Sequence, residues 1–303
     1  MYLHAISLGY AVQGGNFTSS VHSVFHSALN LRLNGENGLL TLVASTESDL
    51  PQGIRLNTPV GFSFEESLTG ETAVCKNSIL HFEKCPLTVQ LSGAWRWKCD
   101  LPALKFDTRN PAVSAAWSFV WDALNERQRQ MGSEVIADDL LHPGDSAQAS
   151  VSRMAGEAMH DLVDTTRQYV LTDNSAVRKL IGLGAGLTPT GDDLLVGYLA
   201  GLWCTVQNGN ERIQFISSLG KRVVDLSPRT NDISWTYLYH AVQGQVSSRL
   251  ANLAEAICIG GNLNHLFDVA ENAMQVGHTS GMDTVTGLLI GLAAWDGNHI
   301  LSN

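Results

Sequence analysis

Basic residues are scarce in this sequence. Its 303 residues include 19 Lys and Arg against 29 Asp and Glu, which gives a formal net charge of -10, and no basic run occurs. Nucleic acid is excluded as a partner, because phosphate backbones are bound by clustered Lys and Arg. A small anionic substrate stays open, since backbone amides can hold one. Charged residues make up only 16% of the chain, which favours a neutral surface used in subunit contacts, including those of a homo-oligomer.

Other common signals are also missing. The five cysteines are odd in number and show no CxxC spacing, so we expect free thiols in a reducing cytoplasm rather than disulfides or a zinc site. The chain has neither a basic, apolar leader nor an apolar run long enough for a bilayer, which predicts a cytoplasmic protein without a membrane partner. It also lacks a GxSxG elbow, a Walker loop and a Rossmann fingerprint. The common enzyme classes are therefore not signalled.

The N-terminal third is predicted to be β-rich. Leu29, Leu31 and Leu33 alternate with polar residues before a turn, and alternation resumes at Leu40 and Leu42, which predicts a hairpin. Short strands with Gly, Pro and Asn turns between them favour an antiparallel barrel or sandwich over residues 1–105. Further strands are expected at Ile54–Leu56, Gly61–Phe64, Thr72–Val74, Ile79–Phe82, Leu87–Leu91 and Trp95–Trp97.

A second domain, residues 106–303, is predicted to be mainly helical, so that the fold class is α+β. Asn110 can cap its first helix and Pro111 suits the first helical position. Helices are expected at 111–131, 148–166, 175–182, 191–207, 211–224, 231–243, 246–259, 264–276 and 282–295. Another helix is expected near the N-terminus, where His22 and His26 would share a face, although no third metal ligand accompanies them.

The helical half contains an internal loop-helix repeat. Residues 182–202 read GLGAGLTPTGDDLLVGYLAGL and residues 277–292 read GHTSGMDTVTGLLIGL, with the shared string GxDxxxGxxxGL. In each copy an aspartate and two glycines are spaced i, i+4, i+8 and lie on one helix face. Glycine stripes let backbones approach closely. We expect the two helices to pack together and to place both loops around one cleft.

The residues of the two loops suit an anionic ligand such as a carboxylate, a phosphate or carbamoyl phosphate. Thr188 or Thr190 can cap the first helix, and the loop amides and hydroxyls can donate hydrogen bonds. The predicted substrate-binding residues are Gly184, Gly186, Thr188, Thr190, Gly191, Asp192, Thr230, Ser234, Thr279 and Ser280.

Three side chains are candidates for catalysis. Asp193 and Asp283 stand at corresponding positions of the repeat, and His278 lies in a Gly-His-Thr-Ser-Gly loop where packing gives little reason for a histidine. Such groups could transfer a proton or polarise a carbonyl. The aspartates could alternatively accept from an amide or hold Mg²⁺, and the sequence identifies no other cofactor. Asp192 can equally serve as a helix-capping acid.

Three boxes carry a family resemblance. The chain has a G-x-G-x-G-L-T-P-[ST]-x-D-D box at 182–193, a T-x-x-[IV]-S-x-x-Y-L segment at 230–238 and a G-H-T-S-G-x-D box at 277–283. In these it resembles a bacterial family that includes the AllH-type subunit of oxamate carbamoyltransferase. The resemblance implies a transferase subunit of purine and allantoin catabolism that works with companion subunits. Its reaction would convert oxalurate and phosphate into oxamate and carbamoyl phosphate.

Two other functions remain open at this stage. The chain could be a non-catalytic binding or scaffold subunit of such a complex, with the boxes forming an interface. It could also be a Mg²⁺-dependent carboxylase or phosphotransferase that acts on a small carboxylate.

Overall fold

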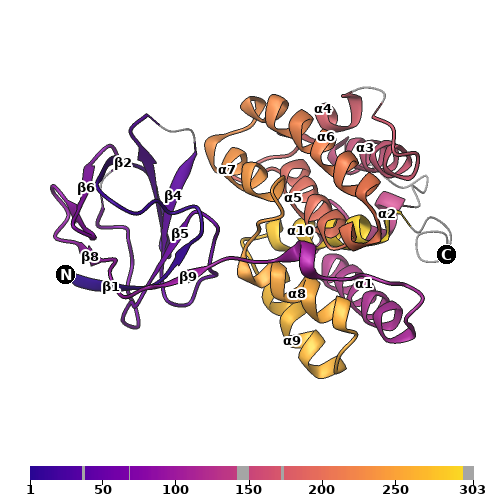
Figure 1. Cartoon of the computed structure of the whole chain (residues 1–303), viewed down its shortest axis with the longest axis horizontal. Coiled ribbons are helices and arrows are strands. Elements are labelled where there is room, and N and C mark those ends of the chain that lie inside the picture. The colour runs from indigo at the N-terminus through magenta and orange to yellow at the C-terminus, as the bar shows by residue number, and fades with distance from the viewer. Residues whose placement is uncertain (36–37, 68, 142–149, 172–173, 296–303) are drawn as a thin grey trace. The chain divides into compact units, whose positions relative to one another are not determined.

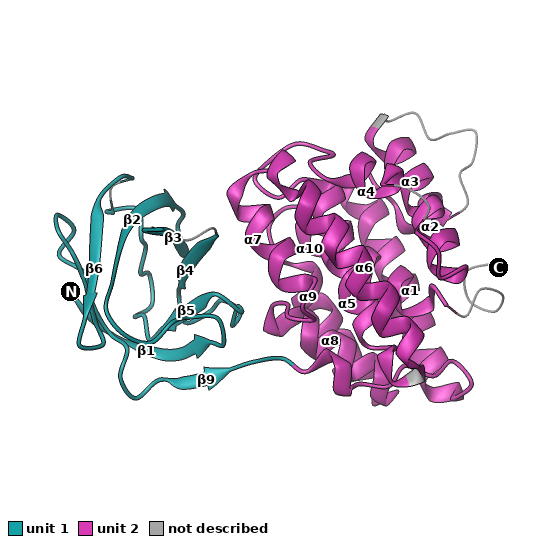
Figure 2. Ribbon diagram, turned by 45° about the horizontal axis from the view of Figure 1, so that its top comes forward, with its two compact units in different colours: residues 1–99 teal, residues 100–303 magenta. Residues whose placement is uncertain are grey.

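The computed structural model describes residues 1–35, 38–67, 69–141, 150–171 and 174–295. The chain forms two compact units, Met1–Cys99 and Asp100–Asn303 (Figure 2). The first unit is built of strands and the second of helices, which confirms the α+β fold class. Among the described residues, no helix combines the length and apolar character that crossing a membrane would require.

The first unit is a closed barrel with eight strands in its wall (Figure 1). The strand order is β5-β4-β3-β2-β6-β7-β8-β1, and β1 closes the barrel by pairing with β5. A ninth strand, β9, adds to β1. The strands are β1 (Tyr2–Gly9), β2 (Phe17–Val24), β3 (Ala28–Leu33), β4 (Leu39–Val43), β5 (Gly53–Leu56), β6 (Thr72–Lys76), β7 (Ile79–Phe82), β8 (Thr88–Gln90) and β9 (Trp95–Trp97).

The predicted hairpin is present as β3 and β4, which pair antiparallel with Leu31 opposite Leu40. Alternate side chains of the strands fill the barrel, where Leu29, Leu42 and Ile54 are fully buried. The sheet is mixed rather than wholly antiparallel, because β1 pairs in parallel with β8 and β9, and β4 in parallel with β5. The strand expected at 61–64 is absent: Gly61 lies in a turn, Phe64 lies in a bend, and the two residues between them are irregular.

The prediction of a helix around His22 and His26 was wrong. Residues 17–24 form β2, which pairs with β3 on one side and β6 on the other. Alternate residues Ser19 and Val21 of this strand are buried. Ladder hydrogen bonds to two neighbouring strands outweigh local helix preference, so the two histidines share no helix face.

The second unit contains all nine helices predicted for it, as α1 and α3 to α10. Asn110 caps α1 by accepting a hydrogen bond from the amide of Ala112, and Gly132 ends the helix with φ 62°. The helix α2 was not predicted, because five residues show no clear period. The helices are α1 (Pro111–Met131), α2 (Ala137–Leu141), α3 (Ser150–Arg167), α4 (Ser175–Leu180), α5 (Thr190–Trp203), α6 (Asn210–Leu226), α7 (Asp232–Ala241), α8 (Ser248–Ile259), α9 (Leu263–Met274) and α10 (Ser280–Ala293), with 3-10 turns at Leu101–Ala103, Val206–Asn208 and Ser227–Arg229.

The centre of this unit is formed by α5 and α10 (Figure 1). Nearly every residue of both helices is buried, from Leu194 to Leu202 in α5 and from Val285 to Ala293 in α10. A helix that is apolar on all sides must be covered on all sides. Other helices supply this cover: the indole of Trp117 on α1 donates to the carbonyl oxygen of Leu289 at 2.9 Å.

Candidate functional site

The glycine stripes of α5 and α10 face each other. A Cβ atom on Gly197 would lie 1.9 Å from the carbonyl oxygen of Thr284, and one on Gly287 would lie 2.1 Å from that of Leu194. Side chains cannot occupy these positions, because such distances are far below van der Waals contact. The predicted packing of the two repeat helices is confirmed, and it depends on backbone-to-backbone contact.

The two helices run parallel and are related by a local two-fold arrangement. A Cβ atom on Gly201, one turn beyond Gly197, would meet Leu288 and Leu292, whereas one on Gly291 would meet Tyr198. The contacts thus advance in the same direction along both helices. Both N-termini therefore lie at one end of the pair, and the positive ends of two helix dipoles lie side by side.

The first turns of the helices contact each other through corresponding residues. On α5 the hydroxyl of Thr190 donates to Oδ2 of Asp283 at 3.0 Å. On α10 the hydroxyl of Ser280 lies close enough to the carboxyl group of Asp193 to oppose the rise in its pKa. Each hydroxyl precedes the aspartate of its own helix by three residues, so the two contacts are reciprocal. The prediction that both aspartates meet at one place is confirmed.

The hydroxyls of Thr188 and Thr190 do not cap α5, although the sequence predicted that one of them would. Pro189 precedes α5 and Thr279 precedes α10, and neither provides a side-chain cap. Instead the hydroxyls of Thr188 and Thr279 lie beside the aspartates, where Thr188 opposes the rise in the pKa of Asp193 and Thr279 opposes that of Asp283. A buried carboxyl group needs partners more than an exposed helix end does, because water can hydrogen-bond the free amides. The hydroxyls therefore serve the aspartates.

Burial controls the charge of this aspartate pair. Asp193 is 5% exposed and Asp283 is 2% exposed. Desolvation raises the pKa of Asp283 to about 7, against the opposing hydrogen bonds of Thr190 and Thr279. Desolvation also raises the pKa of Asp193, and the neighbouring charge of Asp283 raises it further. The pair therefore holds a proton at neutral pH, since two adjacent buried carboxylates cannot both ionise cheaply.

One oxygen of this pair has no partner. Among the described residues, Oδ2 of Asp193 is buried without a hydrogen bond. An unpaired buried polar atom costs on the order of 1–3 kcal/mol. Such atoms concentrate at sites where a ligand or a transferred proton completes the arrangement.

Asp192 connects two of the sequence boxes and is not a simple cap. Its Oδ1 accepts from the amide of Gly182 at 2.9 Å, and its Oδ2 accepts from the hydroxyl of Thr230. Ser234, at the start of α7, also hydrogen-bonds to it. Burial raises its pKa, and these bonds oppose the rise. Asp192 therefore fixes the glycine-rich loop and the segment before α7 against the start of α5.

The loop glycines allow close approach to the helix starts. Gly184 and Gly186 have φ of +106° and +97°, and a Cβ on Gly184 would lie 3.0 Å from the amide nitrogen of Thr190. A Cβ on Gly191 would lie 2.0 Å from the carbonyl oxygen of Leu180. His278 is exposed on the turn that leads into α10. Its side chain is thus at the same end of the helix pair as the aspartates.

Two charged residues near this end were not among the predicted site residues. The carbonyl oxygen of Arg229 would lie 3.4 Å from a Cβ on Gly182, so this exposed arginine borders the glycine-rich loop. Glu134 lies close enough to Asp283 for its charge to raise the pKa of that group. Neither residue lies inside a repeat copy. Arg229 directly precedes the segment at 230–238, which is a signal in the sequence, whereas only proximity in the fold could have revealed Glu134.

Within the described part of the chain, no group of three or more His, Cys, Asp or Glu side chains is arranged to hold a metal ion. A surface cavity of about 320 Å³ is found elsewhere, between α8 and α9, where Glu255, His265 and Leu266 are among its lining residues. It shares no residue with the aspartate pair, so we base the site on the chemistry of the pair.

Fold and site together define a two-unit α+β protein with a carboxyl pair at the joined ends of a helical repeat. Residues 180–292 match the family model described as oxamate carbamoyltransferase subunit AllH, and residues 4–97 match the AllH family N-terminal domain. Together the matches span more than half of the chain, which therefore belongs to the AllH family of oxamate carbamoyltransferase subunits. No significant match exists among solved structures.

Proposed function

We propose that this chain performs carbamoyl transfer at the aspartate pair, within a complex that also contains companion subunits. The observation that carries the proposal is the reciprocal hydroxyl-carboxyl arrangement of Asp193 and Asp283, with one buried oxygen unpaired. The substrates we propose are oxalurate and phosphate, the pair implied by the family. The pathway would be purine and allantoin catabolism in the cytoplasm, which agrees with five free cysteines.

Anion binding is assigned to the loops. Oxalurate carries a carboxylate, and the second substrate is phosphate, so the site must hold two anions. Amides of the loop at 184–188 and the hydroxyls of Thr188 and Thr279 are suitable donors, and the adjacent helix dipoles favour negative charge. Arg229 supplies a positive charge at the border of the loop, although the net charge of the chain is negative. In this proposal Thr230 and Ser234 act indirectly, because they hold Asp192.

The proton-transfer step uses both aspartates. A phosphate oxygen attacks the carbamoyl carbon of oxalurate and gives its proton to the Asp283 carboxylate. The tetrahedral intermediate then breaks its C–N bond, and protonated Asp193 supplies the proton that the departing nitrogen of oxamate needs. Carbamoyl phosphate is the other product. A pKa of about 7 suits Asp283 to this work, since general acid-base groups act best near the working pH.

The oxyanion of the intermediate also needs donors. We assign this role to loop amides and to the imidazole of His278, because His278 is exposed in the turn before α10. If the chain were instead a scaffold subunit, the three sequence boxes would be needed for assembly of the complex and not for catalysis.

Asparagine substitutions separate catalysis from scaffolding. Asp193→Asn and Asp283→Asn keep the size and hydrogen-bonding capacity of each side chain but remove the proton-transferring group. In the complex reconstituted with companion subunits, we expect kcat for carbamoyl phosphate formation to fall by about 100-fold or more. Size-exclusion chromatography should show unchanged assembly. Arg229→Ala, in the same assay, should mainly raise KM for phosphate.

Asp225→Asn is the matched control, because Asp225 is exposed on α6. It should retain wild-type activity. Full activity of both Asp193→Asn and Asp283→Asn in an intact complex would rule out the catalytic proposal and support the scaffold function.

A further inference from the structure

The helical unit exposes large apolar side chains where α8 meets α9 (Figure 1). Ile259, at the end of α8, is 64% exposed, and Leu263 and Phe267 on α9 are 54% and 48% exposed. From Gly261 to Asp268, Leu266 is the one buried residue, so the first two turns of α9 stand open to solvent. Single exposed apolar residues are common, whereas a group of them marks a binding surface.

The surface cavity between α8 and α9 adjoins this helix start. Its volume is about 320 Å³, and Ile259, Leu266 and Val269 are among its lining residues. Glu255 and His265, both exposed, also line it. The cavity therefore offers a place for an apolar side chain next to polar groups that can fix the orientation of a partner.

The start of α9 is fixed by its neighbours before any partner binds. Asn262 caps α9 by accepting from a backbone amide of the first turn at 2.8 Å. Near the other end, Glu271 accepts from Arg127 of α1 at 2.6 Å. A Cβ on Gly260 would lie 2.7 Å from the backbone of Ala112, so the turn before α9 rests directly on α1. A surface held in this way loses little conformational freedom on binding.

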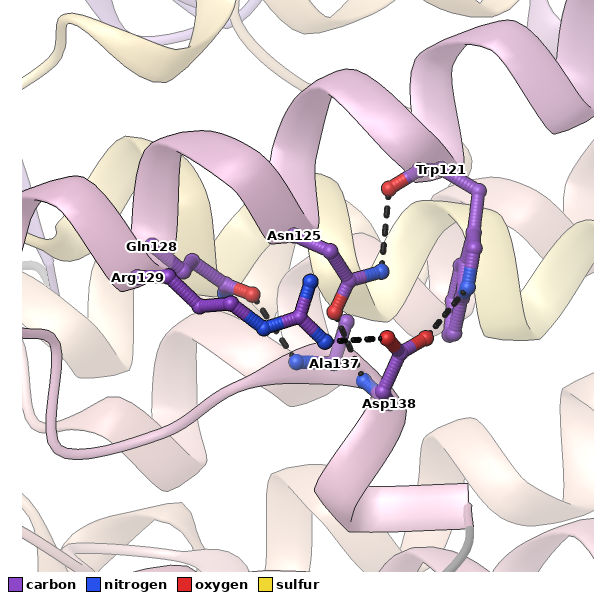
Figure 3. A network of polar contacts seen from close by, with 6 residues as sticks. All are labelled: Trp121, Asn125, Gln128, Arg129, Ala137 and Asp138. Carbon is purple, nitrogen blue, oxygen red and sulfur yellow. Dashed lines mark hydrogen bonds and ion pairs between the residues drawn. The ribbon is translucent and has the colours of Figure 1, made fainter.

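The supporting helix α1 has its own polar groups engaged within the chain (Figure 3). Asn125 accepts from the amide of Asp138 at 2.9 Å, and Asp138 accepts from the indole of Trp121 at 2.8 Å. Gln128 donates to the hydroxyl of Thr286 on α10 at 3.0 Å. These bonds hold α1 against α2 and α10, which gives α9 a firm support.

The charged groups beside the cavity are acidic. Glu255 on α8 and Asp268 on α9 are exposed, and within the described part of the chain neither has a basic side chain as an ion-pair partner. A surface of this charge is complemented by Lys or Arg. The exposed side chains thus call for a partner that is apolar at its centre and basic at its edge.

The family match indicates what kind of partner this is. The chain belongs to a family of oxamate carbamoyltransferase subunits, and α8 and α9 lie within the matched residues 180–292. The exposed large apolar residues Leu187, Ile213 and Tyr239 of that stretch lie on three separate elements. The group at α9 is therefore the surface of the matched part that best suits a companion subunit.

We propose that the first two turns of α9, together with the cavity beside them, bind a companion subunit of the transferase. Apolar side chains of the companion fill the cavity and cover Leu263 and Phe267, and a Lys or Arg of the companion pairs with Glu255. The inference goes beyond the proposed chemistry, because this surface shares no residue with the aspartate pair.

Charged substitutions on α9 test the apolar contact. Leu263→Glu and Phe267→Glu change exposed residues, so the free chain should keep its circular dichroism spectrum and melting temperature. Isothermal titration of the full chain with purified companion subunits should show binding weakened by about 30-fold or more for each variant, as for other apolar anchors. Ile213→Glu on α6 is the matched control, because Ile213 is 40% exposed, and it should bind like the wild type.

Glu255→Lys tests the charge contact in the same titration. Reversal of this charge should weaken binding by about 5-fold at low salt, and the difference from wild type should shrink at high salt. Asp225→Lys makes the same reversal at an exposed position of α6 and should leave binding unchanged. Equal affinities of Glu255→Lys and Asp225→Lys would overturn the pairing of Glu255 with a basic side chain.

Wild-type affinity of both Leu263→Glu and Phe267→Glu would overturn the proposal, and so would equal weakening by Ile213→Glu. Sedimentation of the free chain tests a second copy as the occupant. A dimer that Phe267→Glu converts to a monomer would assign the surface to self-association and would also overturn the proposal. Binding is measured without turnover, so failure here leaves the proposed function to the tests of Asp193→Asn and Asp283→Asn.

Discussion

At the scale of single residues, the main feature is a carboxyl pair that shares its partners across two helices. Thr190 donates to Asp283, and Ser280 interacts with Asp193, so each aspartate has a hydroxyl partner on the opposite helix. Thr188 and Thr279 add a second hydroxyl from the start of the aspartate's own helix. The cost of burying two acids is reduced when one stays protonated. A group kept neutral in this way is available as an acid, and its ionised neighbour as a base.

The raised pKa of Asp283 predicts a pH-dependent stability. The folded chain binds a proton between the ordinary pKa of 3.8 and about 7, so the stabilisation is fully present below the lower value and is lost as pH rises through the upper one. Asp283→Asn removes this dependence. Relative to wild type, the variant should gain up to about 4 kcal/mol in free energy of unfolding between about pH 4 and about pH 8. Urea unfolding across this range measures it.

The exposed control Asp225→Asn should follow the pH dependence of the wild type. Parallel stability curves for wild type and Asp283→Asn would show that Asp283 ionises normally. The acid-base role proposed for it would then lose its support.

At the scale of elements, the contact between α5 and α10 leaves no room for side chains. The backbones of the two helices are in direct contact, because the carbonyl oxygens of Leu194 and Thr284 occupy the space where Cβ atoms on the facing glycines would be. The helices therefore stay close enough for their first turns to exchange hydrogen bonds. Separation by even a methyl group would lengthen the bond from Thr190 to Asp283.

Gly197→Ala should strongly destabilise the helical unit. The added Cβ would lie 1.9 Å from the oxygen of Thr284, so the helices must separate, at a cost of about 3 kcal/mol or more. The matched control is Gly156→Ala on α3, where the nearest atom would lie 3.6 Å away. Helix propensity should make this control neutral or slightly stabilising. Thermal unfolding by circular dichroism compares the two, and equal melting temperatures would contradict the close packing.

At the scale of the whole molecule, each unit has a core of its own. The barrel encloses the side chains of its strands, and the helical unit surrounds α5 and α10. The two family matches follow this division, since one lies within residues 4–97 and the other within 180–292. The intervening helices α1 to α3 lie outside both matches, although α1 supplies Gln128 and Trp117 to the site helix.

Residues 1–99 should fold when expressed alone, because the barrel is closed by its own strands. We expect a β-type circular dichroism spectrum and a cooperative thermal transition. Residues 10–99 lack β1, which pairs with β5, β8 and β9. This shorter piece should aggregate or stay unfolded, because the edges of β5 and β8 are exposed. A non-cooperative transition for residues 1–99 would show that the barrel depends on the helical unit.

Features that depend on local chemistry and on repetition could be predicted from the residues alone. The cap at Asn110, the hairpin of β3 and β4 and the nine longer helices follow from short-range patterns. The repeat also predicted that Asp193 and Asp283 meet, because matching glycine stripes need matching partners.

Features that depend on residues distant in the chain could not be predicted and emerged from the packing of the folded chain. It made residues 17–24 a strand, because β3 and β6 offer hydrogen bonds on both sides. It turned Thr190, one of the two expected capping residues, toward Asp283 on the opposite helix, and it brought Arg229 and Glu134 to the site. The physical reason is that packing decides which polar groups lose contact with water. Those groups must then find partners among residues that are distant in the sequence.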